Sequence, residues 1–564
     1  MADHPGDADA DPLGSQLAFF RFRDAEDALV ARRDRGAKKS VCIVGAGIAG
    51  LVAGYELRRA GHSVVVVEAD DRPGGRIRTW HIGGLSGEFG PMRIPPRHEG
   101  TMHYVDELGL NKGNFVQHNA DGWLLLRNQK ERIADWVNLI PYYGGSPKYL
   151  FPGVPFNKLD TDPERMLQQA LQLAIQRLPI GELWSVFNGS LGPAARALGG
   201  LTLWQLVQGM LEDLAGWAGP WAGTMPGSPR PSSVPPLRMF SDAGWEFIGR
   251  ACGALWEERV GALEACIEDL WVRGAPRIRL TDGMDSLPNK LMARIESLGG
   301  QVRLGVRVTR LDVEAGNDRV RVSSADGEIF AEDGRPFEYV VCAVPASATA
   351  RIEFGPRLAP HKYEALTNLT YLSAAKTLVK VRQRRWEISD HIYGGASYTD
   401  LPLQQCWYPA DNAEPDPEEL RVTQGHGEYY KRFVAKSEDC SREPAVFTAA
   451  YMTGVNAERF TSLSDAERTD ETVRYLEVLH PGISADILDV CHFDWIEGRT
   501  PGGGAWTYFG AGAHERYQEA LCEPHPASAP RVFFAGEHLC VLHGWMQSAI
   551  QSSLEATMAV MDAP

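Results

Sequence analysis

The segment that decides the fold is Ser40-Val-Cys-Ile-Val44, followed directly by Gly45-Ala-Gly47-Ile-Ala-Gly50. A short apolar run, then three glycines, then apolar residues at helical spacing predict a strand, a tight turn and a helix. In such a turn Gly45 makes the bend, Gly47 lets the backbone approach a pyrophosphate, and Gly50 lets the helix pack closely. The segment therefore predicts a dinucleotide-binding unit that begins near Ser40.

An acidic residue stands where such a unit needs one. The next apolar run, Val64–Val67, ends at Glu68, 23 residues after Gly45. A carboxylate at the end of the second strand accepts hydrogen bonds from the hydroxyls of a ribose. Three glycines alone are weak evidence, whereas this order of strand, turn, helix, strand and acid favours a dinucleotide cofactor.

Two further segments favour FAD over a nicotinamide cofactor. In Arg72-Pro-Gly-Gly75-Arg76, two glycines bring the backbone beside a phosphate, and Arg76 neutralises it. Near the end of the chain, Val532-Phe-Phe-Ala-Gly536-Glu537 is an apolar strand that ends in a small residue and an acid. Together with Gly283-Met-Asp-Ser-Leu-Pro288, these segments resemble the flavin amine oxidase family. The cofactor that this resemblance implies is FAD.

The resemblance spans most of residues 40–564 and implies an α/β fold. We expect a discontinuous Rossmann-like FAD-binding domain of the glutathione-reductase type, a mixed β-sheet substrate domain and a helical subdomain. The expected ranges are residues 40–92, 276–345 and 525–564 for the FAD-binding domain, 93–150 and 350–500 for the substrate-binding domain, and 151–265 for the helical subdomain. Residues 1–39 form an N-terminal extension, whose many charges predict a solvated lead-in.

Periodicity agrees with this division of the chain. Apolar residues at helical spacing after Asp162, and again within residues 201–215 and 243–269, predict helices between about residues 160 and 270. From Arg277 onward, short apolar runs at Val302–Val308, Arg319–Val322 and Tyr339–Val344 predict a return to strands. The architecture is therefore expected to be discontinuous.

A substrate-binding segment follows the cofactor-binding unit. Gly90-Pro-Met92-Arg93-Ile-Pro-Pro-Arg-His98 is similar to the segment of L-amino acid oxidases in which the arginine binds the substrate α-carboxylate. A guanidinium grips a carboxylate through two parallel hydrogen bonds and thereby fixes the position of Cα. Taken alone, an arginine at this place is more often a structural ion pair, and the surrounding motif is what favours carboxylate binding.

The resemblance implies roles for three more side chains. Trp545, which follows His543-Gly544, matches the aromatic residue beside the flavin, and Gly544 and Trp545 border the substrate. Tyr451 matches a tyrosine that helps Arg93 to hold the carboxylate, although core packing also explains it. Lys376 matches the lysine that bonds through water to flavin N5, and the alternative is an edge-strand charge. A buried lysine there favours the negatively charged oxygen species formed when oxygen is reduced.

The same resemblance implies a set of cofactor contacts. Val308 is expected to face the adenine through its backbone, Glu537 the ribityl-phosphate region, and Trp495 the flavin. The full set is Gly45, Gly47, Ala49, Gly50, Glu68, Ala69, Gly75, Arg76, Met92, Arg93, Val308, Trp495, Gly536, Glu537, Trp545 and Met546. Gly504 stands where monoamine oxidases carry the cysteine that attaches FAD, so we expect noncovalent FAD.

Composition restricts the partners. A formal net charge of −16 over 564 residues argues against a nucleic-acid partner and mildly disfavours an anionic membrane surface. Nine scattered cysteines without a CxxC pair predict neither a metal site nor a disulfide framework. No long apolar segment or apolar leader is evident, so the expected location is cytoplasmic. The resemblance implies a homodimer.

The predicted reaction is the oxidative deamination of an L-amino acid. Cα–H passes as hydride to flavin N5, the imino acid hydrolyses to a 2-oxo acid and ammonia, and oxygen is reduced to hydrogen peroxide. Three alternatives stay open: an L-amino acid 2-monooxygenase that forms an amide, an amine or polyamine oxidase, and a flavin-containing scaffold without turnover. Arg93 argues against the amine oxidase, because an amine offers no carboxylate.

Overall fold

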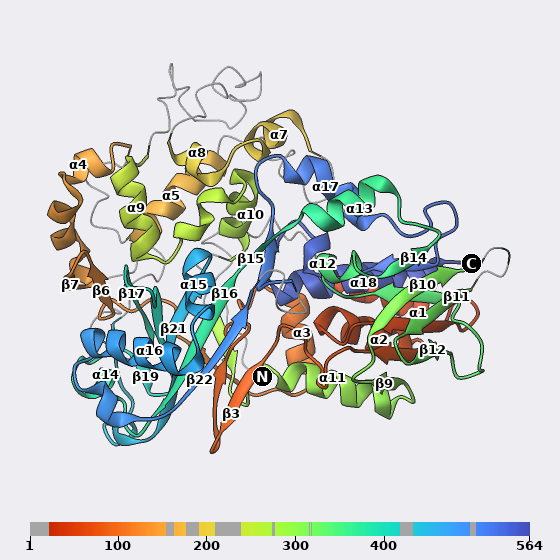
Figure 1. The fold of residues 1–564 in the computed structure, drawn as a ribbon, viewed down its shortest axis with the longest axis horizontal. Coiled ribbons are helices and arrows are strands. Elements are labelled where there is room, and N and C mark those ends of the chain that lie inside the picture. Colours follow the sequence, from red (N-terminus) through yellow and green to blue (C-terminus); the bar gives the residue numbers. More distant parts are fainter. Residues whose placement is uncertain are drawn as a thin grey trace.

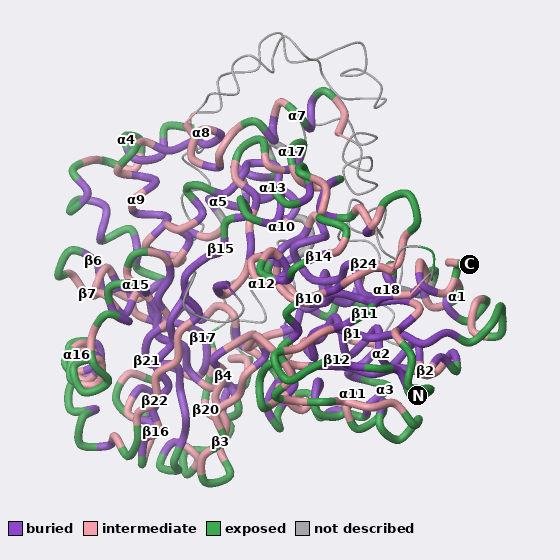
Figure 2. The backbone as a smooth tube through the Cα atoms, turned by 45° about the vertical axis from the view of Figure 1, so that its right-hand side comes forward, coloured by how far each residue is buried: buried purple, intermediate pink, exposed green. Residues whose placement is uncertain are grey.

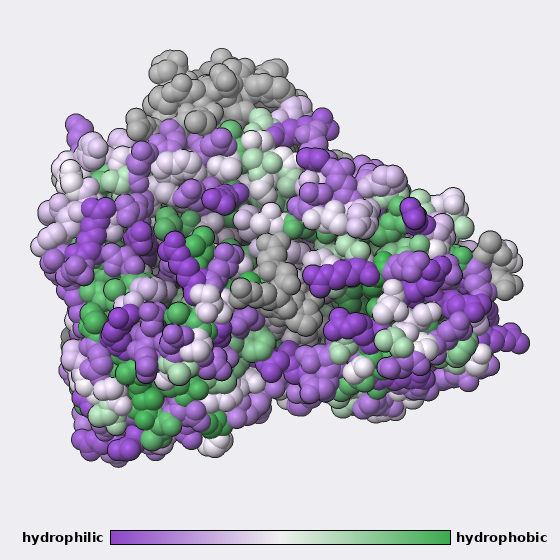
Figure 3. Space-filling model, in the orientation of Figure 1, coloured by the Kyte–Doolittle hydropathy of each residue, from purple (hydrophilic) through white to green (hydrophobic). Residues whose placement is uncertain are grey.

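The computed structural model of the protein describes residues 22–153, 163–175, 191–208, 239–272, 277–314, 316, 319–417, 432–496 and 503–564. Within these residues, a parallel sheet, a larger mixed sheet and a group of helices pack together. Figure 1 shows the parallel sheet on the right, the mixed sheet at the lower left and the helices above it. Hydrophilic side chains cover much of the face drawn in Figure 3.

The parallel sheet is built on the segment that opens with Ser40. Its strands lie in the order β24, β13, β1, β2 and β9, and each adjacent pair is parallel. In that order they span Val532–Phe534, Tyr339–Cys342, Ser40–Val44, Ser63–Val67 and Gln301–Arg303. Every residue of β1 is buried, which is the pattern of a parallel strand that is covered on both faces.

Helices cover one face of this sheet and a second sheet covers the other. On the helical face lie α2 (Ile48–Arg59), α11 (Ser286–Ser297) and α18 (Met546–Asp562). The other face packs against a mixed sheet whose strands lie in the order β12, β11, β10 and β14. In that order they span Gly327–Ile329, Val320–Ser324, Val308–Val313 and Glu353–Gly355. Figure 2 shows the central strands as buried tubes between these two layers.

The strand predicted at residues 302–308 is wrong as a single element. The chain forms β9 up to Arg303 and starts β10 at Val308, and the two strands belong to different sheets. Gly305 turns the chain with φ +72°, and its backbone N–H donates to the carbonyl of Asp70. A glycine with positive φ is the physical reason for the break, since it reverses the chain without strain.

The mixed sheet carries the segments that follow the dinucleotide-binding unit. Its order is β22, β16, β21, β18, β17, β6 and β7. In that order the strands span Ile487–Trp495, Ala374–Val381, Ala445–Thr453, Gln405–Tyr408, Gly395–Thr399, Trp123–Leu126 and Gln129–Arg132. All neighbours are antiparallel except β17 and β6, which are parallel. The expected mixed β-sheet next to a Rossmann-like sheet is therefore present.

The helical region is divided more finely than its periodicity suggested. Instead of one helix over residues 243–269, the chain forms α9 (Asp242–Ala251), a 3-10 turn (Leu255–Arg259) and α10 (Ala262–Trp271). Gly253, with φ +70°, ends α9. The predicted helix over residues 201–215 begins as α8 (Leu203–Val207), and its later part and Asp162 lie outside the described residues.

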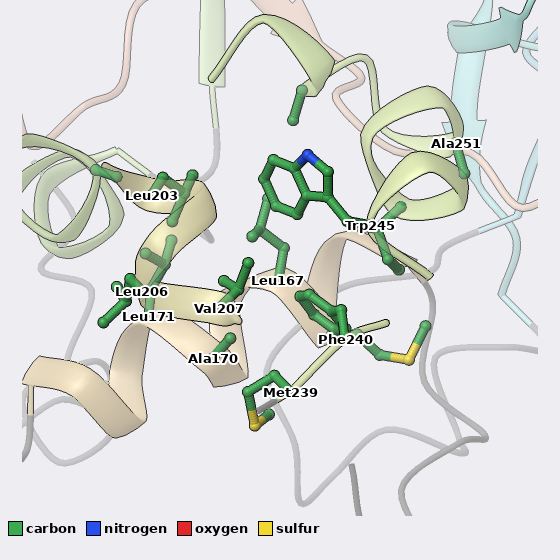
Figure 4. Close-up of a cluster of buried hydrophobic side chains, with 14 of the residues drawn as sticks. Leu167, Ala170, Leu171, Leu203, Leu206, Val207, Met239, Phe240, Trp245 and Ala251 are labelled. Carbon is green, nitrogen blue, oxygen red and sulfur yellow. The ribbon is translucent and has the colours of Figure 1, made fainter. Parts of the chain in front are cut away.

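These helices share one apolar core. Together with α5 (Pro163–Ile175) and α7 (Pro193–Gly199), they bury leucine, valine and aromatic side chains against one another (Figure 4). The same core continues onto the mixed sheet through Tyr398 and Trp407. The apolar contact fixes the helices over the sheet, and this position brings α10 to the cavity described below.

The sequence predicted a solvated lead-in before Ser40. In the structure, part of this segment packs against the rest of the protein. Residues Phe22–Arg33 form helix α1, which packs against α18. Leu29 is buried in this contact, Arg32 pairs with Asp562 at 2.8 Å, and the Lys39 ammonium donates to the carbonyl of Val560 at 2.8 Å. The helix was missed because charged residues make up half of its sequence, and only the packed structure shows which apolar residues are buried.

Candidate active site

The carboxyl ends of the parallel strands border one large cavity of about 840 Å³. The opposite walls come from β16, β18 and β21 of the mixed sheet and from α10. Ligands of open parallel sheets bind at this edge, because the loops that leave the strands converge there. The cavity therefore lies between the predicted dinucleotide-binding unit and the predicted substrate-binding segment.

The fold brings nearly all of the predicted site residues to this cavity. The residues that line it are Gly45, Gly47, Ala49, Glu68, Ala69, Gly75, Arg76, Met92, Arg93, Val308, Lys376, Tyr451, Trp495, Gly536, Glu537, Gly544, Trp545 and Met546. Of the predicted site residues, Gly50 is the one that does not line the cavity. A Cβ at Gly50 would lie 1.9 Å from the carbonyl oxygen of Gly45, so its place is in the packing of α2 behind the turn.

The glycine turn has the shape that a pyrophosphate needs. Gly45 has φ +104°, which suits glycine, and its N–H donates to the carbonyl of Val67 at 2.7 Å. Gly47 caps the N-terminus of α2, and a Cβ built there meets no atom within 4 Å. Because Gly47 lines the cavity, that open space belongs to the cavity. The turn and the helix N-terminus together fit a bound phosphate.

Two glycine substitutions are expected to separate cofactor binding from folding. Gly47→Ala adds a methyl group to the open cradle, so we expect an unchanged melting temperature of the apoprotein and weaker FAD binding. Gly50→Ala drives Cβ into the backbone of Gly45, so we expect the free energy of unfolding to fall by about 3 kcal/mol. Thermal unfolding and FAD titration of both apoproteins measure these effects, and equal destabilisation by the two variants would contradict them.

Glu68 lies at the entrance of the same cradle. Its carboxylate accepts hydrogen bonds from the backbone N–H of Ala46 at 2.7 Å and of Asp70 at 2.9 Å. These two bonds hold the side chain between the ends of β1 and β2, where it lines the cavity. The remaining lone pairs of a carboxylate in this position suit a ribose diol.

Arg76 and Glu537 form a buried ion pair on the cavity wall. The guanidinium donates to the Glu537 carboxylate at 2.7 Å, and the other Glu537 oxygen accepts from the N–H of Gly544 at 3.0 Å. Burial alone would raise the pKa of Glu537, but Arg76, the histidines His543 and His538, and the Gly544 N–H together outweigh burial and keep that pKa below its ordinary value. Glu537 thereby ties the segment with Arg76 to the loop that carries Trp545, and Arg76 keeps further donors for a phosphate.

Arg93 places an unsatisfied cation in the cavity. Its Nη1 is buried and has no hydrogen-bond partner, and no carboxylate of the described residues pairs with the guanidinium. The guanidinium instead lies over the ring of Trp407, with 5.1 Å between Cζ and the ring centroid. A structural ion pair, which was the alternative for this arginine, is therefore not found among the described residues. A buried donor of this kind calls for an anionic ligand.

Lys376 is buried within the same wall rather than exposed at a sheet edge. Its strand β16 lies between β22 and β21, and the residue is 4% exposed. The ammonium donates to the carbonyls of Gly90 at 2.7 Å and Glu88 at 3.2 Å. Burial lowers the pKa of Lys376 to about 7, with Glu88 acting to raise it and Arg93 to lower it.

Aromatic rings complete the pocket beside these charges. Lys376 Nζ lies 4.7 Å from the ring centroid of Tyr451, and burial raises the pKa of Tyr451 to about 12, so its hydroxyl stays protonated. Trp545 precedes α18 and meets the ring of His98 edge to face at 5.0 Å. Burial lowers the pKa of His98 to about 3, so this ring is neutral. Trp495 donates from its indole N–H to the carbonyl of Phe89 at 3.0 Å.

Comparison with known proteins agrees with this arrangement. The family model described as flavin containing amine oxidoreductase matches residues 48–561. The chain belongs to this family. Among curated relatives, the L-amino-acid oxidase of Vipera ammodytes ammodytes is 28% identical over 96% of this chain and 97% of its own length. The L-amino-acid oxidase of Daboia russelii is also 28% identical, over 96% of this chain and 93% of its own.

Solved structures show the same fold at lower identity. Cyclohexylamine oxidase from Brevibacterium oxydans IH-35A superposes with a TM-score of 0.63 and 19% identity, covering 93% of this chain and 99% of that one. Putrescine oxidase bound to putrescine gives a TM-score of 0.59 with the same identity and coverage. The predicted FAD-binding fold of the amine oxidase type is confirmed. The family also carries a flavin, and the cradle of Gly47, Glu68 and Arg76 fits FAD.

Several cavity residues of this flavin-containing amine oxidoreductase were not found from the sequence. Trp256 and Trp506 meet edge to face, with 5.5 Å between ring centroids, on the wall next to Gly544. Trp506 stands two residues after Gly504, and that proximity was the available signal. Glu268 of α10 also lines the cavity, and nothing in its local sequence sets it apart from a surface acid.

In the described part of the chain, no group of three or more His, Cys, Asp or Glu side chains is arranged to hold a metal ion. Among the same residues, no helix is both long and apolar enough to cross a membrane. The large cavity is the candidate active site.

Proposed function

We propose that this protein oxidises the α-carbon of an L-amino acid, giving a 2-oxo acid, ammonia and hydrogen peroxide. The observation that carries the proposal is Arg93, whose buried Nη1 lacks a partner on the wall of the flavin-sized cavity. A substrate α-carboxylate supplies the missing partner and fixes Cα through a bidentate contact. An amine substrate would leave this guanidinium unpaired in a buried site.

The side chains around Arg93 have the other roles in the proposed reaction. The Tyr451 hydroxyl, which stays protonated because burial raises its pKa to about 12, donates to the carboxylate beside Arg93. Trp545 and Trp495 wall the site with flat apolar rings that exclude water from the reacting carbon. The ammonium of Lys376 faces the negative charge that develops as oxygen is reduced. Bound FAD supplies the hydride acceptor.

The protein need not provide a base for the amine. His98 is held neutral by its burial, with a pKa of about 3, and packs on Trp545. We propose that the site selects the form of the amino acid with an uncharged amine. The aromatic rings beside the amine carry no carboxylate that would stabilise its protonated form. This assigns His98 to orienting Trp545.

The decisive experiment is aerobic incubation of the purified flavoprotein with each common L-amino acid. We expect peroxide, ammonia and a 2-oxo acid of matching mass in equal amounts. An amide one carbon shorter, with little peroxide, would make the protein an L-amino acid 2-monooxygenase. Turnover of amines without turnover of amino acids would make it an amine oxidase, and an unreduced flavin under anaerobic conditions with every substrate would make it a scaffold.

We further propose that FAD is bound without a covalent bond. Of the nine cysteines, all of which lie in described residues, Cys252 lines the cavity, and its thiol donates to the carbonyl of Ile248 in α9. Gly504 occupies the position of the attaching cysteine. After acid denaturation and centrifugation, the yellow colour is expected in the supernatant. A yellow pellet would contradict noncovalent binding.

Two proposals concern the protein in its cell. A homodimer rests on the family resemblance, and sedimentation of the purified protein tests it. A cytoplasmic location rests on the sequence features described above, and fractionation of the source cells tests it.

A further inference from the structure

One wall of the cavity is strongly acidic. Glu164 of α5, Glu257 of the 3-10 turn, and Glu264 and Glu268 of α10 all line it. Arg93 and Tyr451 line the same cavity, and the apolar core of the helices holds α10 over the mixed sheet. Four carboxylates on one wall of a site for an amino acid are not explained by binding of the α-carboxylate.

Three of the four carboxylates already have partners. Glu164 pairs with Nδ1 of His118 at 3.0 Å. Glu264 accepts from Nδ1 of His543 at 3.0 Å and from the backbone N–H of Phe509. Glu257 is buried and also has an interaction of its own. These carboxylates hold the helices and the loop before Trp545 in place.

Glu268 is different. It is half-buried, and no hydrogen bond or ion pair joins its carboxylate to any residue in the described part of the chain. The negative charge of Glu268 raises the pKa of Tyr451 while Arg93 lowers it, and Glu268 also raises the pKa of Glu264. Both the Glu268 carboxylate and the Arg93 guanidinium therefore act on the same tyrosine hydroxyl across one cavity.

Several buried polar atoms of residues that line the same cavity also lack hydrogen-bond partners. They include Nη1 of Arg93 and Nε2 of His98, a residue that is 1% exposed. Two other cations on this cavity bond to backbone carbonyls: Lys376 to those of Gly90 and Glu88, and Arg277 to that of Val272 at 3.2 Å. An α-carboxylate satisfies Arg93 and leaves the negative charge of Glu268 unpaired. In a cavity of low dielectric, that charge favours a ligand with a cation.

We propose that Glu268 determines substrate specificity by pairing with a cationic side chain, so that the substrates are basic L-amino acids such as L-lysine and L-arginine. This inference rests on the proposed function, because it takes the α-carboxylate to be held by Arg93. One ligand then carries both complementary charges, a carboxylate for Arg93 and an ammonium or guanidinium for Glu268. Recognition of two opposite charges by two unpaired side chains gives specificity as well as affinity.

The test compares substrates that differ in side-chain charge. L-arginine is paired with L-citrulline, and L-lysine with L-norleucine, and kcat/KM is measured for the holoenzyme and for Glu268→Gln. We expect the wild type to prefer the cationic member of each pair, and Glu268→Gln to lower its kcat/KM about thirtyfold. The neutral member is expected to stay within about threefold of the wild type. Glu246→Gln is the control, because Glu246 pairs with Arg127 and Arg250 outside the cavity.

Three results would overturn the inference. An equal loss for the cationic and neutral members would show that Glu268 contacts a part common to both substrates or acts structurally. A wild type that oxidises L-norleucine and L-citrulline but neither cationic substrate would refute the inference and leave the proposed function standing. Reduction of the flavin by no amino acid would refute both. The wild-type comparison needs no variant, so it decides the question even if Glu268→Gln loses its flavin.

Discussion

Replacing Arg93 with alanine is expected to lower kcat/KM for L-amino acids by about a thousandfold, corresponding to about 4 kcal/mol. The guanidinium has a buried Nη1 without a hydrogen-bond partner on the cavity wall, so its loss leaves the α-carboxylate unpaired. The side chain also packs over Trp407, and alanine removes that contact. Kinetics with the best L-amino acid substrate and with the amine formed by its decarboxylation measure the effect.

The comparison with the decarboxylated amine separates carboxylate binding from general damage. If Arg93 holds the carboxylate, the variant loses activity toward the amino acid, whereas its activity toward the amine does not fall below that of the wild type. Arg93→Lys keeps the charge but loses the planar, two-pronged donor, so an intermediate loss is expected. A parallel loss for both substrates, at full flavin content, would mean that Arg93 has a structural role and that the proposed function needs another anchor for its substrate.

The dinucleotide-binding part of the site was readable from the sequence because its parts are local. Gly45, Gly47, Gly50 and Glu68 lie within one strand-turn-helix-strand unit, in which spacing alone fixes geometry. The structure adds a distinction that spacing cannot make. Gly47 faces the cavity, whereas Gly50 is buried against the carbonyl of Gly45.

The charges that complete the site were readable only in part. Arg93 was found because its segment resembles a family motif, yet the absence of a partner could not be known before β18 and β21 were placed beside it. Glu268 had no motif at all. Its position depends on the packing of α10 against α5, α7 and α8, which is set by dispersed apolar contacts rather than by local spacing.

The wrong predictions about the fold also come from contacts that are distant in the chain. The break between β9 and β10 depends on Gly305, which donates to Asp70 at the end of β2, far away in sequence. Helix α1 depends on Leu29 reaching the surface of α18. In both places a contact that is distant in the chain outweighed the local pattern.

Replacing Lys376 with methionine is expected to slow the reaction of the reduced enzyme with oxygen by a factor on the order of a hundred or more. The ammonium is buried on the cavity wall, held by the carbonyls of Gly90 and Glu88, so it is preorganised toward the negative charge that oxygen acquires. Methionine has a similar length and no charge. Stopped-flow mixing with oxygen, after anaerobic reduction by the amino acid, measures this step separately from substrate oxidation.

The pH dependence of that step gives an independent check. Burial lowers the pKa of Lys376 to about 7, so the ammonium is present below pH 7 and is lost as the pH rises through that value. The rate of reaction with oxygen should therefore fall as the pH rises through about 7 in the wild type and be flat in Lys376→Met. Lys380→Met, on the same strand but outside the cavity, is the matched control and should keep the wild-type profile. A Lys376→Met variant that retained both the wild-type rate and its pH profile would exclude the ammonium from the oxygen reaction.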